Sequence, residues 1–379
     1  MTAKDLLLAC LRQEFFGIPC MVDWGKVSAS EAGQLYTLAK EQDMAHAVAA
    51  VLQKAGKKSD AFQKQLVLAI ARREMQTREL EMICGVLEEG GIPHLPLKGS
   101  LLCKLYPQPY LRTSCDIDLL VKKEDMEKAV ALLVEQLGYT REKKVEFHDL
   151  SLYSSTGVHL ELHFSLREGR TDMDGVLDEV WEHVLPVEES AFRYRMDGAF
   201  LLFHITAHMA YHFTGGGCGI KPLADLLLLT EADEFDCEAF RSLCRRGGME
   251  TFYHNALHLA QVWFRDGSHT ELTLAMEEYL LRGGVYGTEH NAVAAKQTRA
   301  GGKGKYAFSR IWMPKEQLAV RYNGRKVDGI RLPYYQARRW VETVFAGRLK
   351  KAVGELNTNR TMDVTVSERV EAMLSELGL

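Results

Sequence analysis

The sequence predicts an α+β protein in which one mixed β-sheet lies between helical N-terminal and C-terminal regions. Residues 1–90, and again most of those after 167, repeat apolar side chains at three- and four-residue spacing, which is typical of amphipathic helices. Residues 92–166 instead contain apolar runs and alternating patterns bounded by turn residues, which indicates strands. The order strand, helix, strand and hairpin favours a mixed sheet with helices on one face.

Composition sets limits on the class of protein. The 379 residues suffice for two or three domains, and the 46% hydrophobic and 26% charged fractions are those of a globular protein. A net charge of −4 argues against a protein that binds nucleic acid over its whole surface. No apolar run reaches the roughly 18 residues of a membrane span, and the N-terminus does not resemble a secretory signal. We therefore expect a cytoplasmic location and no membrane partner.

The eight cysteines are scattered along the chain, and no two have Cys-x-x-Cys spacing. This spacing is the usual mark of a structural zinc site, so the sequence does not predict one. We expect most of these cysteines to be buried thiols in a reducing compartment.

Residues 1–90 are predicted to form a helical N-terminal region. Apolar residues recur at helical spacing in the segments 4–15, 31–40, 44–55 and 60–89. The last segment is long, and Gly90-Gly91 directly after it is a typical helix stop. We identify no chemistry in this region.

Residues 91–190 are predicted to contain the sheet. Its strands are expected at 92–97, 116–121, 139–144, 146–153 and 158–164. A helix over 123–137, ended by Gly138, follows the second strand, and the Ser-Ser-Thr-Gly sequence at 154–157 forms a hairpin turn. The segment 101–106 after the first strand is expected to form about two turns of helix.

The rest of the chain is predicted to be helical. Residues 191–291 form one further region and residues 292–379 a basic C-terminal region. Helices are expected at 175–184, 198–213, 220–231, 236–247, 250–264 and 270–282. Residues 292–351 hold 15 Lys and Arg against 3 Asp and Glu, interleaved with aromatic residues. Such a segment can contact an anionic acceptor such as RNA, or it can be a solvated face that balances the acidic remainder.

Two acidic residues mark the second strand. Asp116 and Asp118 are two positions apart, so in a strand their side chains project from the same face. Their neighbours Ile117, Leu119 and Leu120 are apolar, and two carboxylates held together in such surroundings repel each other. A divalent cation bound between them is the simplest explanation.

A possible phosphate site precedes this strand. Gly99-Ser100 follows the first apolar run and opens a short helical segment. Free N–H groups at a helix N-terminus attract phosphate, and glycine lets the backbone approach closely, although Ser100 can equally be an ordinary helix cap. Lys98 and Arg112 can reach a triphosphate from the strand end and the following loop, or they can form structural ion pairs.

These motifs in this order resemble the DNA polymerase β-like nucleotidyltransferases. That superfamily has a strand, a Gly-Ser that opens a helix, a strand with Asp-x-Asp, and a third carboxylate on a later strand. Gly99-Ser100, Asp116-Ile117-Asp118 and Glu161 occupy these places. Lys98, the Leu-Tyr-Pro sequence at 105–107 and Arg112 are similar to one bacterial branch, the uncharacterised nucleotidyltransferase family. The resemblance extends well over residues 90–230.

The resemblance implies a catalytic core at 91–190 and a helical domain at 191–291 that closes the cleft. Asp116, Asp118 and Glu161 would then hold two Mg²⁺ ions, with Mn²⁺ as an alternative, and Glu161 would also be able to accept the hydroxyl proton. In the helical domain, the pair His208 and His212, followed by Lys221 and Asp225, resembles a family pattern. This implies contacts with the nucleotide, or hydrogen bonds that pack the domain.

Three histidines, His204, His208 and His212, recur at four-residue spacing on one helical face. A zinc site is conceivable there. Over eight residues, however, the helix rises about 12 Å, which is too far for one ion to bind all three.

We therefore expect an enzyme that transfers a nucleoside monophosphate from an NTP to a hydroxyl acceptor and releases pyrophosphate. The acceptor can be a small molecule, a protein or an RNA. Alternatives are a toxin-like enzyme that modifies a protein or tRNA, and a non-catalytic nucleotide sensor. The complete set of three acids argues against the sensor. Neither the nucleotide base nor the acceptor follows from the motifs.

Overall fold

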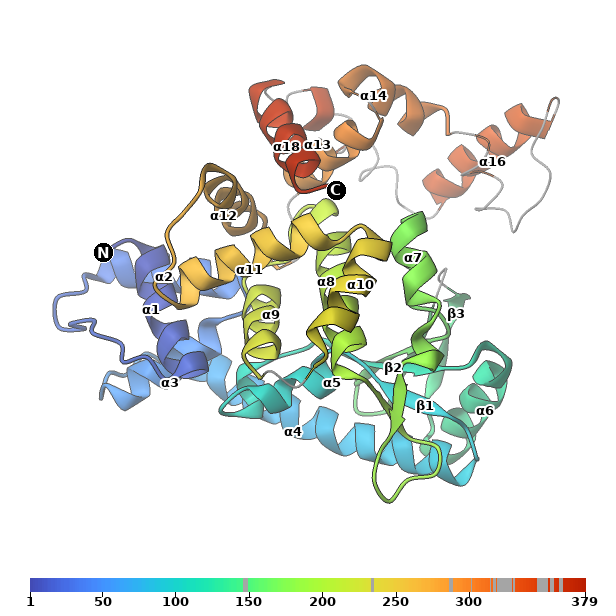
Figure 1. Cartoon of the computed structure of the whole chain (residues 1–379), viewed down its shortest axis with the longest axis horizontal. Helices are drawn as coiled ribbons and strands as arrows, with labels where there is room; N and C mark the ends of the chain where they lie inside the picture. Colours follow the sequence, from blue (N-terminus) through green and yellow to red (C-terminus); the bar gives the residue numbers. More distant parts are fainter. Residues whose placement is uncertain are drawn as a thin grey trace.

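The computed structural model of the chain describes residues 1–145, 149–232, 235–285, 289–300, 302–313, 315, 318, 329, 331–345, 354, 358–360 and 364–379. Within these ranges helices surround a five-stranded mixed sheet, which confirms the predicted α+β class (Figure 1). The first residues of the predicted strand 146–153 and much of the basic segment 292–351 lie outside the described residues. Among the described helices, none has the length and apolar character needed to cross a membrane.

The N-terminal region consists of four helices close to the predicted positions: α1 Ala3–Phe16, α2 Ala29–Glu41, α3 Ala45–Lys54 and α4 Asp60–Glu89. Thr2 and Ser28 are the N-caps of α1 and α2, and each forms a capping box. The side chain of the cap accepts a hydrogen bond from the backbone N–H three residues later, and the acidic side chain of that residue accepts one from the backbone N–H of the cap. Arg12 of α1 donates hydrogen bonds to the carbonyl oxygens of Trp263 and Val262. This contact ties the N-terminal region to helices late in the chain.

The sheet has the strand order β1-β2-β5-β4-β3. The strands are β1 His94–Pro96, β2 Asp116–Val121, β3 Thr140–Val145, β4 Asp149–Tyr153 and β5 His159–His163. β2 and β5 pair in parallel, and the other neighbours pair in antiparallel orientation. The predicted hairpin therefore returns the chain to the edge of β2, which places the third acidic strand directly beside the Asp-x-Asp strand.

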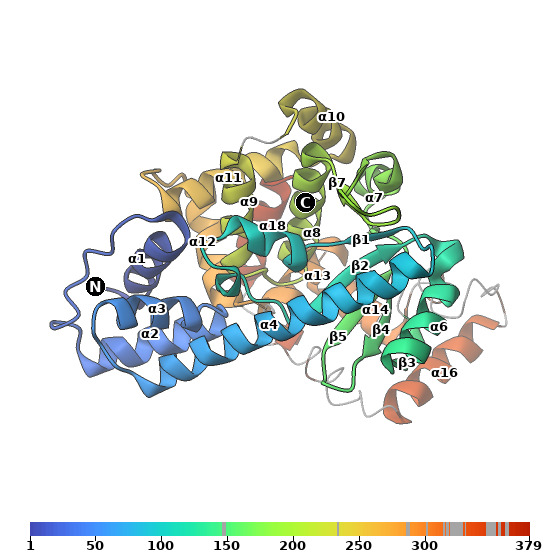
Figure 2. The ribbon, with the colours of Figure 1, turned by 90° about the horizontal axis from the view of Figure 1, so that it is seen from below.

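The two faces of the sheet have different chemistry. On one face Ile117, Leu119, Leu160 and other apolar side chains pack against α4 and α6 Met126–Leu137. Figure 2 shows both helices on this side of the sheet. Because side chains alternate along a strand, the polar residues of β2 and β5 project from the opposite face. The predicted acids therefore face away from the helices of the sheet region.

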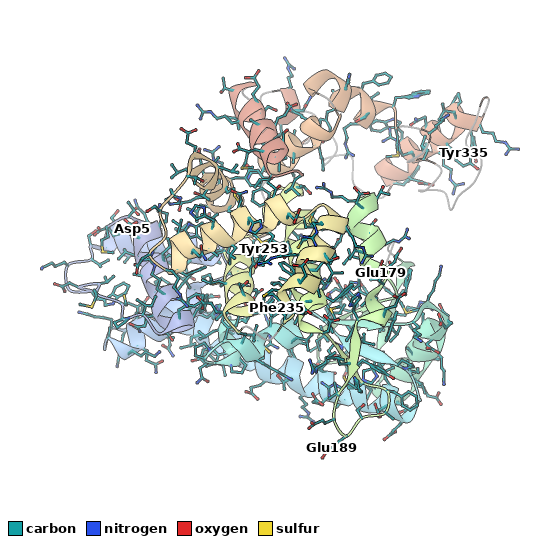
Figure 3. The ribbon with its side chains drawn as sticks, in the orientation of Figure 1. Asp5, Glu179, Glu189, Phe235, Tyr253 and Tyr335 are labelled. Atoms are coloured by element: carbon teal, nitrogen blue, oxygen red, sulfur yellow. The ribbon has the colours of Figure 1, made fainter. Side chains whose placement is uncertain are left out.

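The segment after β5 differs from the prediction. The expected helix 175–184 begins earlier and is shorter, as α7 Thr171–Leu177, and a 3-10 turn follows at Val180–Glu182. An unpredicted hairpin comes next, formed by β6 Val184–Pro186 and β7 Tyr194–Met196, with Glu189 in its connecting loop at the lower edge of Figure 3. The carboxylate of Glu88 at the end of α4 accepts hydrogen bonds from residues 190–192 of this loop. This tertiary contact has no local sequence signal.

Five helices form the other wall of the molecule: α8 Gly198–Thr214, α9 Lys221–Glu231, α10 Cys237–Gly247, α11 Glu250–Phe264 and α12 Glu271–Gly283. All five lie near the predicted positions. Their shared core contains large buried side chains such as Phe203, Phe213, Phe252 and Trp263. This rigid core holds α8 and α9 against the polar face of the sheet.

The C-terminal region contains α13 Glu289–Ala300, α14 Lys303–Ile311, α16 Arg331–Phe345 and α18 Val364–Glu376. α18 packs on α12 and α13 and buries Met373 and Leu374 in the main core, and Leu377 directly after it is buried there too. α16 lies further out, with Tyr335 labelled in Figure 3. A short helix after β1, α5 Gly99–Leu102, and a 3-10 turn at Cys103–Leu105 replace the two helical turns predicted at 101–106.

Candidate active site

A cavity of about 460 Å³ opens between the polar face of the sheet and helices α8 and α9. It collects residues that are far apart in the sequence. The predicted site residues in its lining are Lys98, Gly99, Arg112, Asp116, Asp118, Glu161, His208, His212, Lys221 and Asp225. Ser100 is not part of this lining. Folding thus gathers ten of the predicted residues around one space.

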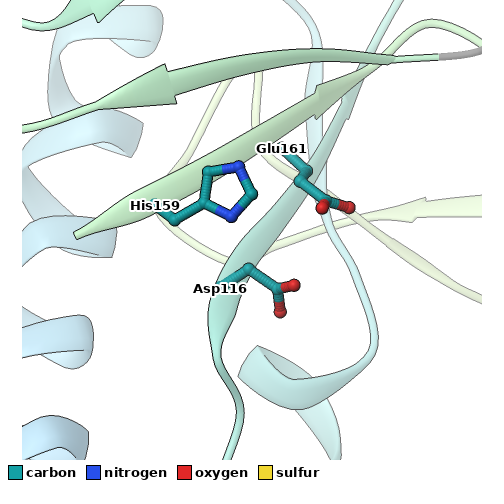
Figure 4. Close-up of side chains that lie close together, drawn as sticks. All are labelled: Asp116, His159 and Glu161. Atoms are coloured by element: carbon teal, nitrogen blue, oxygen red, sulfur yellow. The ribbon is translucent and has the colours of Figure 1, made fainter. Parts of the chain in front are cut away.

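The register of β2 and β5 brings the three acids together. Asp118 is directly opposite Glu161 in the parallel pairing, and Asp116 is opposite His159. Asp116, His159 and Glu161 have ligand atoms that all lie within 4.8 Å of one another, and the same holds for Asp118, Glu161 and His163. Figure 4 shows the first of these groups, with two side chains from β5 facing one from β2. Both groups are compact enough that one metal ion could contact all three ligands.

Charges around Asp118 and Glu161 push their pKa values apart. Burial alone would raise the pKa of Asp118, but Lys98 Nζ and His163 Nε2 each lie 3.0 Å from its Oδ1 and hold the pKa well below its usual range. Burial, followed by the charges of Asp118 and Asp116, raises the pKa of Glu161 to about 7. The negative charges of the acids therefore repel each other, and a bound cation would relieve this repulsion.

The turn before α5 has an unusual backbone. Lys98 has a φ of 40°, a backbone angle that residues other than glycine rarely adopt. A Cβ on Gly99 would lie 3.0 Å from Ser114 Cβ and 3.2 Å from Arg112 Nη1, so a side chain at this position would be crowded. With only four residues, α5 has little helix dipole to offer a phosphate. The turn contributes to the cavity mainly through Lys98 and the backbone of Gly99.

Arg112 and Asp225, both predicted to contact the nucleotide, bond to each other. Arg112 donates from Nη2 and Nε to the two carboxylate oxygens of Asp225, at 2.8 and 3.2 Å. The hydroxyl of Tyr106 donates to the same carboxylate at 2.8 Å. Asp225 is almost fully buried. The pair connects the loop before β2 to α9, so its first role is to fix the cavity wall.

Lys221, one helical turn before Asp225 on α9, makes a similar connection. Its Nζ donates to Asp43 Oδ2 and to the carbonyl oxygen of Thr113, both at 2.8 Å. The Thr113 hydroxyl donates to the same Asp43 oxygen at 2.6 Å. The carboxylate of Asp43 therefore joins the N-terminal helices, the loop before β2 and α9.

The histidines of α8 form a row with a carboxylate at one end. His208 Nδ1 lies 2.7 Å from Glu168 Oε1, and His208 Nε2 lies 3.1 Å from His212 Nε2. His204 is buried, and among the residues that the structure describes neither of its ring nitrogens has a hydrogen-bond partner. The two metal-type clusters found among the described residues are both on β2 and β5, so the zinc alternative for these histidines gains no support.

Sequence reasoning did not single out several residues of the cavity. Glu168 follows β5 in an irregular segment where no spacing rule applies, and Asp43 lies at the end of a helix in a region without recognisable motifs. Ser114 had a usable signal, because it continues the alternation of Asp116 and Asp118 by two residues. Its Oγ donates to Asp116 Oδ1 at 2.8 Å and so orients the first acid.

Comparison with known proteins addresses the resemblance directly. The sequence model of a family described as uncharacterised nucleotidyltransferase matches residues 28–265. This is more than half of the chain, and it spans every predicted site residue. The chain belongs to the uncharacterised nucleotidyltransferase family. No curated protein matches the chain.

Within this nucleotidyltransferase family member, the matched residues run from α2 to the start of the turn after α11. The match therefore contains both the sheet with its three acids and the helices that face them. The cavity is lined almost wholly by residues of the matched region, with Val285 beyond it. The C-terminal helices lie outside the match.

Proposed function

We propose that the protein is a nucleotidyltransferase that moves a nucleoside monophosphate from an NTP to a hydroxyl acceptor and releases pyrophosphate, using Mg²⁺ or Mn²⁺. The observation that carries the proposal is the β2–β5 register, which sets Glu161 opposite Asp118 on the face that Asp116 shares. Membership of the nucleotidyltransferase family supports the same reaction class. A scaffold would gain nothing from three repelling acids beside a cavity.

The residues present fit a pair of divalent cations. Carboxylate oxygens are the ligands that Mg²⁺ prefers, and a nearby imidazole also suits Mn²⁺. Asp116, Asp118 and Glu161 would hold the ions, and His159 and His163 lie close enough to join or orient them. When bound, such ions neutralise the triphosphate and align the attacking hydroxyl with the α-phosphate.

The protein itself supplies position and charge around this centre. Lys98 brings a positive charge to the wall beside Asp118, where the negative charge of a triphosphate would otherwise be opposed by the acids. The ion pairs Arg112–Asp225 and Lys221–Asp43 hold the loop before β2 against α9, so the opening between sheet and helices keeps its shape. Such fixed geometry is the main protein contribution to phosphoryl transfer.

Calorimetry tests the proposal. Wild-type protein is titrated with ATP, CTP, GTP and UTP in the presence of Mg²⁺, beside the double variant Asp116→Asn/Asp118→Asn. Glu142→Gln, which changes an exposed acid on β3, is the matched control. We expect at least one NTP to bind wild type and the control equally, with affinity about tenfold or more weaker in the double variant. Folded wild-type protein that binds none of the four would refute the proposal.

Transfer is then followed with the α-³²P form of the NTP that binds. Label that moves to a macromolecule in a cell extract, and that Glu161→Gln abolishes, would identify a protein or RNA acceptor. Label that appears only on small products would identify a small-molecule acceptor. A nucleotide that binds with Mg²⁺ but is never cleaved in either assay would identify a sensor instead.

A further inference from the structure

Glu168, His208 and His212 form a continuous hydrogen-bonded row along the wall of the cavity. The row begins at Glu168, whose side chain is only 8% exposed, and ends at His212, which is exposed. The two links measure 2.7 and 3.1 Å, which are ordinary hydrogen-bond lengths. All three residues line the same cavity as the acids of β2 and β5. A buried carboxyl group is thus connected, through His208, to the imidazole of an exposed residue.

Two proton arrangements, one with Glu168 ionised and one with its proton on Oε1, satisfy both hydrogen bonds with neutral rings and exchange the donor and acceptor roles along the row. If Glu168 is ionised, His208 donates from Nδ1 to it and accepts at Nε2 from His212, which leaves Nδ1 of His212 as an acceptor. If Glu168 is protonated, it donates to His208 Nδ1, His208 donates to His212 Nε2, and Nδ1 of His212 carries a proton. The two arrangements differ by one proton, which enters at His212 and comes to rest on Glu168.

The surroundings favour the carboxyl end as the resting place of that proton. Burial raises the pKa of Glu168 to about 8 and lowers that of His208 well below its usual range, because both groups are less stable when charged. The row therefore holds the proton at its carboxyl end below about pH 8 and can accept one where Glu168 is ionised, in both cases without a buried imidazolium. The other titratable groups that act on Glu168 and His208 are Lys98, Asp118, Asp174, His163 and His204.

His204 supports the assignment of this wall to a ligand. It lies one turn before His208 on α8 and is 1% exposed, yet both of its ring nitrogens lack partners in the described part of the chain. A buried imidazole without hydrogen bonds is costly, unless a bound molecule or water supplies them. Its place in the cavity lining indicates that an occupant of the cavity reaches this helix.

We propose that Glu168, His208 and His212 are a proton relay that removes the proton of the acceptor hydroxyl during nucleotidyl transfer. This rests on the proposed function. The hydroxyl O–H bond breaks as its oxygen bonds to the α-phosphorus, and the bond from α-phosphorus to the leaving oxygen breaks, so pyrophosphate leaves with that electron pair. The proton passes to His212 Nδ1, the Nε2 proton of His212 to His208 Nε2, and the Nδ1 proton of His208 to Glu168.

The relay resolves a conflict in the role of Glu161. A carboxylate that holds a metal ion is a weaker proton acceptor, because the cation stabilises its negative charge. With the relay, the three acids of the sheet bind cations and the row on α8 takes the proton. His212 is then the catalytic residue that touches the acceptor, and Glu168 and His208 act through it.

Histidine ring ¹⁵N spectra test the relay without any substrate. Protein labelled with ¹⁵N-histidine is titrated from pH 6 to 9, and His208→Gln and His212→Gln assign the signals. We expect the two histidines to exchange tautomers together as Glu168 loses its proton, and Glu168→Gln to abolish the exchange. Independent titration of either ring to imidazolium, or an exchange that persists in Glu168→Gln, would overturn the relay whether or not the protein transfers nucleotides.

Turnover provides the second test, with the NTP that binds in calorimetry, Mg²⁺ and water as the acceptor. Glu168→Gln should lower the rate of pyrophosphate release by about 100-fold, the usual share of a general base, with NTP affinity within about twofold of wild type. Free imidazole should restore release in His212→Ala in proportion to its concentration, whereas His254→Gln, an exposed histidine on α11, should behave as wild type. Loss of NTP affinity in Glu168→Gln, or absence of imidazole rescue, would refute the relay.

Discussion

Lys98 combines an unfavourable backbone with a favourable side-chain contact. Its φ of 40° and ψ of −111° fall in a region that only glycine adopts readily. Such a conformation costs roughly 1–3 kcal/mol, and it persists only where the surrounding structure holds it in place. From this position Nζ reaches the buried carboxylate of Asp118 at 3.0 Å. The strained backbone therefore places the positively charged Lys98 side chain beside Asp118, the central acid of the site.

Two substitutions of Lys98 separate the backbone from the side chain. Lys98→Gly and Lys98→Ala both remove the partner of Asp118, so both should destabilise the protein. The glycine variant should nevertheless be more stable than the alanine variant by about 1 kcal/mol, because it relieves the positive φ. Urea unfolding followed by circular dichroism measures the difference. An alanine variant of equal or greater stability would show that the backbone is not strained.

Cys20 has the properties of a reactive thiol. A hydrogen bond from the buried Cys10 thiol stabilises its thiolate and lowers the pKa of Cys20 to about 6 despite partial burial. Because the thiolate is the nucleophile, alkylation by iodoacetamide should rise between pH 5 and 7 and then level off. Cys10→Ala removes the donor and should move this rise to higher pH. Peptide mapping by mass spectrometry gives both profiles, and an unchanged profile in the variant would contradict the assignment.

At the scale of elements, the buried pair Arg112–Asp225 attaches α9 to the loop before β2. Removing one partner leaves the other charge buried, which typically costs about 3 kcal/mol or more. We expect Arg112→Leu and Asp225→Leu each to lower the free energy of unfolding by about this amount. The double variant should lose clearly less than the sum, because it buries no unpaired charge.

The exposed pair Arg141–Glu127 is the control for this cycle, since it is also joined by two hydrogen bonds but lies at the surface. Its coupling should be much smaller, because water screens exposed charges. Chemical denaturation of both sets of variants gives the coupling energies. Additive effects of Arg112→Leu and Asp225→Leu would mean that the pair does not join the two elements.

Local sequence signals predicted the elements well where one rule governed them. The pattern of β2 and β5 placed Asp116, Asp118 and Glu161 on strands that do pair, and helical spacing placed α4 and α8. The hairpin β6–β7 was missed because Glu88, about a hundred residues earlier, accepts the hydrogen bonds of its loop. Three-residue strands carry too little alternation to be read without that partner.

For the whole molecule, the sequence predicted which polar residues would lie around one cavity. It did not predict which of them would bond to each other. For Arg112 and Asp225 the sequence left nucleotide contact and a structural bond both open, and in the structure they bond to each other. The opposite happened with Glu168, which carries no motif yet bonds to His208 in the wall of the cavity. Partner choice between charged groups depends on distances that only the assembled fold sets, so a motif can name the participants and leave their pairing open.

Hydrogen exchange tests whether the sheet and α8 act as one site. The cavity is lined from the loop before β2, from β5 with the segment after it, and from α8 and α9. Binding of Mg²⁺ and the NTP identified by calorimetry should therefore slow amide exchange in all of these segments together, while α18 should be unaffected. A ligand that binds only the native state makes local unfolding of its binding segments less favourable. The amide hydrogens of those segments then exchange more slowly with solvent.

The pattern of protection decides between two ways in which the nucleotide can sit. Protection limited to 112–118 and 161–168 would mean that the acids hold the triphosphate alone, and it would contradict the assignment of His208 and His212 to the nucleotide site. Protection that includes 204–212 would require the nucleotide to bridge both walls. Asp118→Asn should remove the protection everywhere at once, because the cation centre on the sheet anchors the ligand that reaches α8.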